Sequence, residues 1–181
     1  MKGMRMNKPV ISIAQGAKGA QGKLAKSGGA LRTAALHAIS AALRAGTQEI
    51  ISANELDIEA AVCGGMSESM TDRLRLTPER IEGMAQGVDD VAAMPDPLGA
   101  VLWGSTRPNG LKIEKVSVPL GVVAIIYEAR PNVTSDAAAL CLKSGNAVIL
   151  RGGKEAINSN TAITRIMRNA AAGAGLDADC I

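Results

Sequence analysis

The sequence RGGK, Arg151–Lys154, has the chemistry of a phosphate site. Gly152 and Gly153 let the backbone come close to a ligand, because neither residue carries a side chain. Arg151 and Lys154 add two positive charges at short range. The spacing fits neither a Walker A loop nor a G-x-G-x-x-G fingerprint. It leaves two interpretations open, a phosphate site and a solvated turn, since glycine and lysine are common in turns.

A second group of polar side chains occupies the sequence YEARPN, residues 127–132. The group consists of Tyr127, Glu128, Arg130 and Asn132. It directly follows an apolar run, at the kind of position where open α/β sheets bind ligands. The simpler alternative is that Glu128 and Arg130 pair with each other at the surface, where an ion pair contributes little to stability.

Two apolar runs must position these groups. Residues 122–126 contain no polar member, as expected of a parallel strand covered on both faces, and residues 147–150 form a second such run. Between them, Thr134 or Ser135 can cap a helix that Gly145 ends. The pattern predicts a right-handed strand, helix, strand unit of an α/β fold. Because ligands bind beyond the carboxyl ends of such strands, both polar groups are expected to project into one crevice.

Helical periodicity covers much of the chain before residue 95. It predicts helices over residues 30–45, 47–62 and 78–95, and a later one over residues 159–172. The glycine-rich sequence GAKGAQGK near the N-terminus is expected to be flexible or weakly helical. The single histidine, His37, has no evident partner in the sequence and is expected to be exposed or structural rather than catalytic.

The pattern changes between the helical part and the first apolar strand. MPDPLGAVLWGSTRPNG, residues 94–110, is expected to be a loop. Alternation in LKIEKVSV, residues 111–118, predicts a strand. Its apolar residues change phase near Lys115, which predicts a bulge or a change of exposed face there. Pro119 indicates an edge or a strand boundary.

Composition excludes several classes of protein. With 181 residues, 47% of them apolar, the chain can bury a core. A diffuse net charge of +3 and only two aromatic residues, Trp103 and Tyr127, disfavour nucleic-acid binding. The apolar segments are too short for a membrane span or a signal-peptide core. Three cysteines without metal-ligand spacing predict no metal site and fit a reduced, cytoplasmic chain.

The sequence VPLGVVAIIYEARPNVTSDAAALCLKSGNAVILRGGKEAINSN, residues 118–160, resembles the glutamate-5-semialdehyde dehydrogenase (gamma-glutamyl phosphate reductase) family of the aldehyde dehydrogenase superfamily. The resemblance continues more loosely upstream, through NELDIEAA, GMSESMTDRLRLTPERI and DPLG, and covers the chain from about Leu24. It implies an aldehyde dehydrogenase-like α/β fold. Its parts are N-terminal helices (1–109) packed on the cofactor domain, a β arm of the oligomerisation type (110–119) and the first half of a Rossmann-like, NADP-binding domain (120–181). That domain is expected to be incomplete, since two parallel strands do not make a stable sheet alone.

The resemblance implies NADPH-dependent reduction of L-glutamyl 5-phosphate to L-glutamate 5-semialdehyde and phosphate, in proline biosynthesis. In this class of enzyme a cysteine thiolate expels phosphate to form a thioester, which hydride then reduces. The family's nucleophilic cysteine lies downstream of RGGKEA and is absent here, so the chain alone is expected to be inactive. Cys141, in an apolar helix, is expected to be buried and inert. The alternative is a non-catalytic nucleotide-binding or assembly fragment.

The resemblance also assigns roles to the first polar group. Tyr127 and Glu128 belong to the loop that lies along the cofactor. Asn132 is the candidate amide donor to the developing oxyanion. The sequence also allows Arg130 in the place of that amide, where it would bind a carboxylate or phosphate of the substrate. The arm implies a homo-oligomer.

The second polar group, Arg151, Gly152, Gly153 and Lys154, matches the stretch that contacts the adenosine ribose of the cofactor. In the superfamily an acidic residue there often favours NAD by holding the 2′-hydroxyl. Positive charge in this stretch favours the 2′-phosphate of NADP instead, although the nearby Glu155 opposes that preference.

Overall fold

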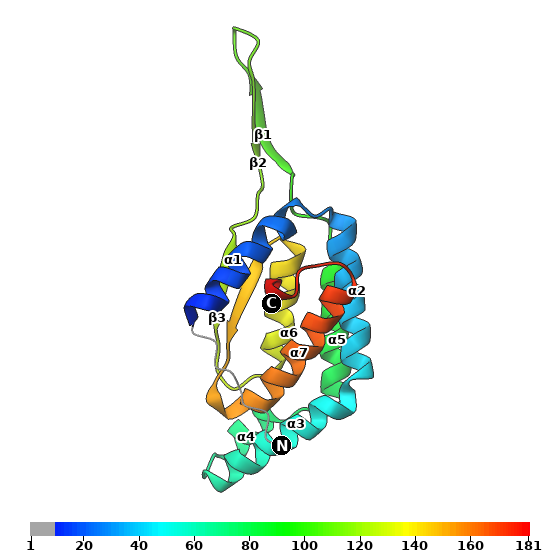
Figure 1. The fold of residues 1–181 in the computed structure, drawn as a ribbon, viewed down its shortest axis with the longest axis vertical. Helices are drawn as coiled ribbons and strands as arrows, with labels where there is room; N and C mark the ends of the chain where they lie inside the picture. The colour runs from blue at the N-terminus through cyan, green and yellow to red at the C-terminus, as the bar shows by residue number, and fades with distance from the viewer. Residues whose placement is uncertain (1–9) are drawn as a thin grey trace.

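The structure of the protein is a computed structural model that describes residues 10–181, and Figure 1 shows how its helices and strands are arranged. A body of helices packs on a two-stranded sheet, and a narrow hairpin extends from one end of it. In chain order the elements are α1 (Val10–Lys26), α2 (Gly29–Ala45), α3 (Thr47–Cys63), α4 (Glu68–Leu74), α5 (Pro78–Ala93), β1 (Val101–Thr106), β2 (Lys112–Val116), β3 (Val122–Ile126), α6 (Asn132–Lys143), β4 (Ala147–Arg151), η1 (Lys154–Ala156), α7 (Ile157–Gly173) and η2 (Ala178–Cys180).

The largest helix contacts in the body are those of α2 with α5 and with α7. Leu36, Ile39 and Leu43 share one face of α2 because of their spacing, and all three are fully buried. Ile81 on α5 and Ile163 on α7 are fully buried in the same cluster. Burying a side chain of this size contributes about 1.5–3 kcal/mol relative to leaving it exposed.

The helices predicted from periodicity are confirmed, with ends that differ by no more than a few residues. The start of α5 illustrates the local cause. The Oγ1 atom of Thr77 accepts a hydrogen bond from the backbone N–H of Arg80 at 3.2 Å, and Pro78 occupies the first turn. Both features stabilise a helix start before any tertiary contact is made.

The N-terminal segment is more regular than the sequence indicates. We expected GAKGAQGK to be flexible or weakly helical, whereas it lies within the continuous helix α1. Ala17, Ala20 and Leu24 are buried where α1 packs against β4 and η2. A β-carbon on Gly16 would come within 3.0 Å of a carboxylate oxygen of Asp179, so the small residue permits this close approach. Tertiary packing therefore outweighs the low helix propensity of glycine.

The hairpin β1–β2, called the arm below, corrects the expectation of a loop over residues 94–110. Val101–Thr106 form a strand that pairs antiparallel with β2. The pairing shifts between Val101 and Trp103, opposite Val116 and Lys115, so the irregularity expected near Lys115 is present. The unpaired extra residue is Leu102, which belongs to the other strand of the hairpin.

The parallel pair β3–β4 forms the sheet of the body. Val122 pairs with Ala147, and Ile126 pairs with Arg151. β4 begins in the core, where Ala147 and Val148 are buried, but β3 is only partly covered and Ile126 is 84% exposed. The expectation that β3 is covered on both faces is therefore wrong for the part of the chain that the structure describes. Within that part, β3 has a single strand neighbour.

Candidate active site

The register of the parallel pair brings the two polar groups side by side. Ile126 and Arg151 are partners, and the ladder continues one step further, because the backbone N–H of Tyr127 donates to the carbonyl oxygen of Arg151 at 3.1 Å. The segments that follow β3 and β4 then leave the sheet at the same edge. The crevice expected between the two groups is present only in part, because Tyr127 shares one cavity with Arg151 and Gly152 while Arg130 and Asn132 line another.

The glycines of the second group permit this contact. A β-carbon on Gly152 would lie 3.1 Å from the ring of Tyr127 and 2.2 Å from Nδ2 of Asn160. A β-carbon on Gly153 would lie 3.4 Å from the backbone of residues 128 and 129 and 2.5 Å from the carboxylate of Glu155. These positions require glycine because protein atoms fill the space, a reason that the sequence alone does not reveal.

A buried chain of hydrogen bonds holds the first loop on α6 and α7. The Oγ1 atom of Thr134 lies 2.7 Å from the phenol oxygen of Tyr127 and donates to Oδ1 of Asn160 at 3.0 Å. Because the single hydroxyl proton of Thr134 is used in the second bond, Tyr127 donates the first. Burial raises the pKa of Tyr127, and the bond to Thr134 opposes this. The phenol is therefore a neutral donor near pH 7.

Thr134 and Asn160 were not predicted in this role. The sequence suggested Thr134 or Ser135 as a helix cap, but α6 begins earlier, at Asn132, and no side chain caps its N-terminus. Thr134 is fully buried inside the first turn of α6. The Nδ2 atom of Asn160 is buried and has no hydrogen-bond partner in residues 10–181. An unpaired buried donor is costly and indicates a site where an acceptor is missing.

Two cavities flank the loop of residues 127–132. The first, of about 380 Å³, lies at the carboxyl end of β4 and is lined by Tyr127, Arg151, Gly152 and Asn160 together with other residues of α7. The second, of about 400 Å³, is lined by Arg130 and Asn132 together with residues of α4 to α6. The predicted site residues are thus divided between two sides of one loop.

Of the predicted site residues, Glu128, Gly153 and Lys154 line neither cavity. Arg130 donates its backbone N–H to the carbonyl of Glu128 at 2.8 Å, but their side chains form no ion pair among those found in residues 10–181. Lys154 is exposed at the start of η1, next to the partly buried Glu155. A guanidinium N–H of Arg151 donates to the carbonyl of Gly152, so this side chain folds over its own loop.

A buried carboxylate ties α3 to the start of α7. Asp57 accepts hydrogen bonds from the backbone N–H groups of Asn158 and Ser159, at 3.1 and 2.8 Å, and from the hydroxyl of Ser159 at 2.6 Å. Asn54, one turn earlier, donates to the carbonyl of Leu74 at 2.9 Å and accepts from the N–H of Leu76 at 2.7 Å. Asn54 and Asp57, both in the sequence NELD, thus hold the end of α4 and the start of α7 against α3.

Two of the three cysteines are buried, and one of them is Cys141, for which the sequence predicted burial. Burial raises the pKa of Cys141, and it raises the pKa of Cys180 to about 11, so both are protonated near neutral pH. Cys63 is exposed at the end of α3 and lines neither cavity. His37 is exposed as expected, and its Nδ1 atom lies 2.9 Å from a carboxylate oxygen of Asp89.

Two further features of residues 10–181 bear on the kind of site the chain can hold. No helix in this range combines the length and the apolar character that crossing a membrane requires. No three side chains of histidine, cysteine, aspartate or glutamate within it are grouped so that they could hold a metal ion.

Comparison with known proteins identifies relatives. No protein-family profile matches the chain. Curated gamma-glutamyl phosphate reductases of Rhodospirillum rubrum and Clostridium novyi are 52% and 53% identical to it, over 95% and 96% of the chain. The crystal structure of gamma-glutamyl phosphate reductase from Thermotoga maritima superimposes with a TM-score of 0.94 at 36% identity, over 96% of the chain. This chain is homologous to the gamma-glutamyl phosphate reductases.

The homology covers part of the relatives' length. The chain spans about 40% of the two curated reductases and 42% of the Thermotoga maritima structure. A probable aldehyde dehydrogenase from Listeria monocytogenes superimposes with a TM-score of 0.71 at 18% identity, which shows a shared fold. The chain therefore has the aldehyde dehydrogenase-like α/β fold that its sequence indicated.

Proposed function

We propose that the protein that carries this chain is an NADPH-dependent gamma-glutamyl phosphate reductase. It would convert L-glutamyl 5-phosphate to L-glutamate 5-semialdehyde and phosphate in proline biosynthesis. The observation that carries the proposal is the identity of about half of the residues, over nearly the whole chain, with reductases of that name. The two cavities on either side of residues 127–132 support it, since the reaction brings together two ligands of different kinds.

The cavity at the end of β4 fits the phosphorylated ribose end of a nicotinamide dinucleotide. Arg151 supplies positive charge at its edge. Asn160 lines the same cavity and carries the unpaired buried donor. When bound, the cofactor supplies the hydride that reduces the acyl group. Lys154 lies in the stretch where an acidic residue would favour NAD, and its positive charge favours NADP instead.

The loop between the cavities is suited to hold the reacting carbonyl group. Asn132 opens α6, and its amide lies on the substrate side of the loop, where it can donate to a developing oxyanion. Arg130 lines the same cavity and can neutralise an anionic group of the substrate. Tyr127 fixes the loop through Thr134, so the two donors keep their positions.

The nucleophile of the proposed reaction is expected to lie outside residues 1–181. The buried thiols of Cys141 and Cys180 have raised pKa values, so neither forms the thiolate that attack on an acyl phosphate needs. Cys63 lines neither cavity. The contribution of the described residues is therefore to bind both ligands and to orient the carbonyl group.

The activity is best tested with the full-length protein in the reverse direction. The semialdehyde, phosphate and NADP+ are supplied, and formation of NADPH is followed by its absorbance. The proposal predicts turnover that requires phosphate as well as the semialdehyde. Binding of NADPH without turnover would instead support the alternative of a non-catalytic nucleotide-binding protein.

Cofactor preference has its own test. Replacing Arg151 and Lys154 by alanine removes the charges proposed to hold the 2′-phosphate, so binding of NADPH should weaken about 10-fold or more while binding of NADH changes little. Equal losses for both cofactors would contradict the assignment of NADP.

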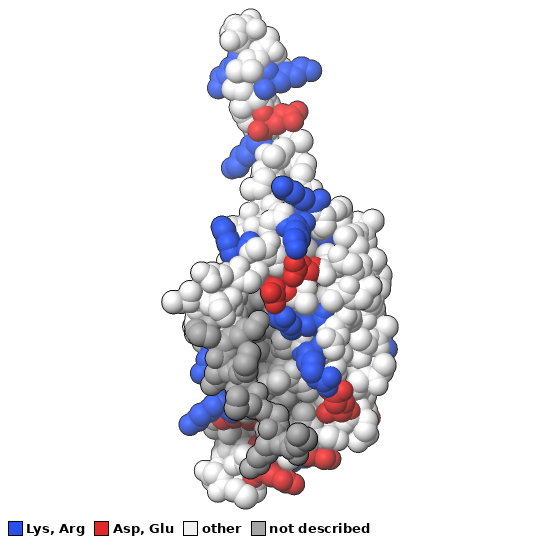
Figure 2. Space-filling view, in the orientation of Figure 1, with Lys and Arg blue, Asp and Glu red and all other residues white. Residues whose placement is uncertain are grey.

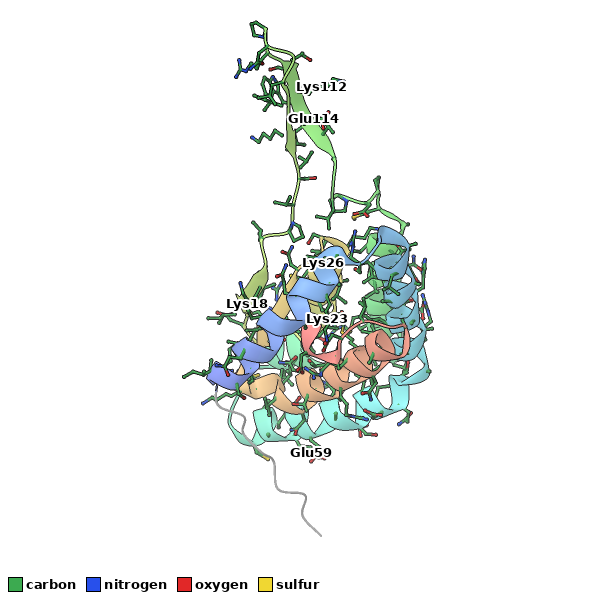
Figure 3. All side chains as sticks on the ribbon, turned by 45° about the horizontal axis from the view of Figure 1, so that its top comes forward. Lys18, Lys23, Lys26, Glu59, Lys112 and Glu114 are labelled. Atoms are coloured by element: carbon green, nitrogen blue, oxygen red, sulfur yellow. The ribbon has the colours of Figure 1, made fainter. Side chains whose placement is uncertain are left out.

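The arm is proposed to contact a second copy of the protein. It extends clear of the body, and Lys112 and Glu114 stand on it away from all helices (Figure 3). Leu102 and Trp103 are 62% and 51% exposed, which leaves apolar area uncovered on a narrow hairpin. Sedimentation of the full-length protein should show an oligomer, and Trp103→Ser should shift it towards the monomer. A monomeric wild type would contradict the proposal.

A cytoplasmic location is also proposed. All three cysteines are free, as is usual in a reducing compartment. Charges of both signs are mixed on the face shown in Figure 2, from the arm to the helical body. Such a surface is typical of a protein that associates with neither polyanions nor membranes.

A further inference from the structure

The cavity on the substrate side carries an unusual set of charges. Four arginines and two aspartates are among the residues that line it: Arg73, Arg75, Arg80, Arg130, Asp72 and Asp136. They come from the end of α4, the connection to α5, the start of α5, the loop after β3 and the first turns of α6. Segments separated by more than fifty residues thus converge on one hollow with both signs of charge.

Two of these charges are already satisfied by each other. The guanidinium of Arg80 lies 3.1 Å from the carboxylate of Asp72 and donates to the carbonyl of Arg75 at 2.7 Å. This pair shapes the wall of the cavity but leaves no charge for a ligand. Arg75 also lines two neighbouring hollows, so its side chain is shared between them.

Arg73 and Arg130 differ from Arg80. Within residues 10–181 neither side chain takes part in an ion pair or a side-chain hydrogen bond. Arg73 stands in the last turn of α4, which is anchored to α3 through Asn54, and Arg130 stands on the loop that Tyr127 fixes. Two exposed arginine side chains on anchored segments therefore line this cavity, and within residues 10–181 neither has an anion of the protein as a partner.

Asp136 supplies the opposite charge. Its only hydrogen bond in residues 10–181 is a long one, 3.3 Å, from Nδ2 of Asn132. Desolvation raises the pKa of Asp136, and the bond from Asn132 only partly offsets this. No arginine of the cavity forms an ion pair with it. The carboxylate is thus not a counter-ion that the protein uses for its own arginines.

A ligand that satisfies all three groups must carry both a negative and a positive charge. We propose that this cavity binds the amino-acid end of the substrate, with its α-carboxylate on Arg73 and Arg130 and its α-ammonium on Asp136. The inference rests on the proposed function, and it assigns a binding role to Arg73 and Asp136. Arginine binds carboxylates through paired donors, and aspartate is a matching acceptor for an ammonium group.

The dimensions of the site agree with this assignment. Asn132 and Asp136 lie one turn apart on the same side of α6, and Nδ2 of Asn132 is 3.3 Å from a carboxylate oxygen of Asp136. The α-carbon and the acyl carbon of the substrate are three bonds apart, about 4 Å. A substrate whose ammonium group is bound to Asp136 can therefore present its acyl oxygen to the amide of Asn132.

Guanidinium groups bind phosphate as readily as carboxylate, so the experiment must separate these two anions. The full-length protein is assayed in the reverse direction with the semialdehyde, and with 5-oxopentanoate, which is the same aldehyde without the amino group. Asp136→Asn should raise the KM for the semialdehyde about 10-fold or more and leave that for 5-oxopentanoate within about 2-fold. Arg73→Gln should raise the KM for both aldehydes and leave the KM for phosphate unchanged.

The controls separate binding from folding. Arg107→Gln, on the arm outside both cavities, should change none of these constants. Arg73→Lys keeps the charge without the paired donors and should give an intermediate KM. A raised KM for phosphate in Arg73→Gln would overturn the inference in favour of a phosphate site, and equal losses for both aldehydes in Asp136→Asn would overturn it in favour of a structural role. In either case the reductase activity of the wild type would stand. A wild type without turnover would overturn both proposals.

Discussion

The helical body and the strands of this molecule use their apolar residues in opposite ways. The apolar stripes of α5 and α7 both pack against α2, on which Leu36 is fully buried. In the arm and at the end of β3, large apolar side chains are left exposed, Leu102 to 62% and Ile126 to 84%. The same kind of residue thus stabilises the fold in one region and remains uncovered in the other.

The contrast explains what each region is for. The buried stripes and the satisfied carboxylate of Asp57 give the body a rigid frame. The candidate site lies where this frame meets the strands, at the carboxyl ends of β3 and β4. Apolar area left uncovered on the strands is suited to contacts with further protein. Substitutions should therefore affect stability in the body and association in the arm.

The largest expected effect tests this contrast with a matched pair of leucines. Leu36→Ala should lower the free energy of unfolding of the full-length protein by about 2–5 kcal/mol, because it leaves a cavity in the core. Leu102→Ala should change it by less than about 0.5 kcal/mol per protomer. Chemical denaturation measured on both variants checks this. Similar losses at the two positions would break the distinction between the regions.

A smaller loss is expected from the polar part of the frame. Asp57→Ala removes the acceptor for the N–H groups at the start of α7 and should cost about 2–3 kcal/mol of unfolding free energy. Glu55→Ala, at an exposed position of the same helix, should cost a few tenths of a kcal/mol. If the two variants were equally stable, the link between α3 and the site would have no energetic role.

An acid-sensitive contribution is expected at the rim of the body. Desolvation raises the pKa of Asp89, but hydrogen bonds from Ser40, Arg44 and His37 outweigh it and lower the pKa from 3.8 to about 2. The resulting stabilisation is present above pH 4 and is lost as the pH falls through 2. Relative to Asp89→Asn, the wild type should be more stable by about 1–2 kcal/mol at pH 5, and the difference should vanish near pH 2. A difference independent of pH would contradict this origin.

The smallest effect concerns accessibility and leaves stability unchanged. In the native protein a thiol reagent should modify Cys63 quickly, because this residue is exposed. Cys141 and Cys180 are buried with raised pKa values and should react only after unfolding. Rapid modification of either buried thiol would show that the body opens more easily than its packing indicates.

The sequence predicts those parts of the fold in which a single pattern decides the structure. The helices of the body follow from apolar periodicity, and β4 from a run of apolar residues. The strand β1 was missed because both of its faces are exposed, so VLWGST shows no alternation of polar and apolar residues. The helix α1 was missed because its packing partners, β4 and η2, lie far along the chain, and only the fold shows that Gly16 allows the close approach of Asp179.

The candidate site was predictable only in part, because some of its residues are brought together only by the tertiary fold. The ends of β3 and β4 located the two polar groups, since strand register brings them together. The supporting residues Thr134 and Asn160, and the charged pair Arg73 and Asp136, come from segments that only the tertiary fold assembles. No spacing in the sequence links α4 to α6, so Arg73 carries no signal until the cavity is seen.

The most direct test of the account is a crossed kinetic comparison of the two cavities in the full-length protein. The KM values for NADP+ and for the semialdehyde are measured side by side in Arg151→Ala and in Asp136→Asn. We expect Arg151→Ala to raise the KM for NADP+ alone. We expect Asp136→Asn to raise the KM for the semialdehyde alone. If both variants changed the same constant, the loop of residues 127–132 would not divide a cofactor side from a substrate side.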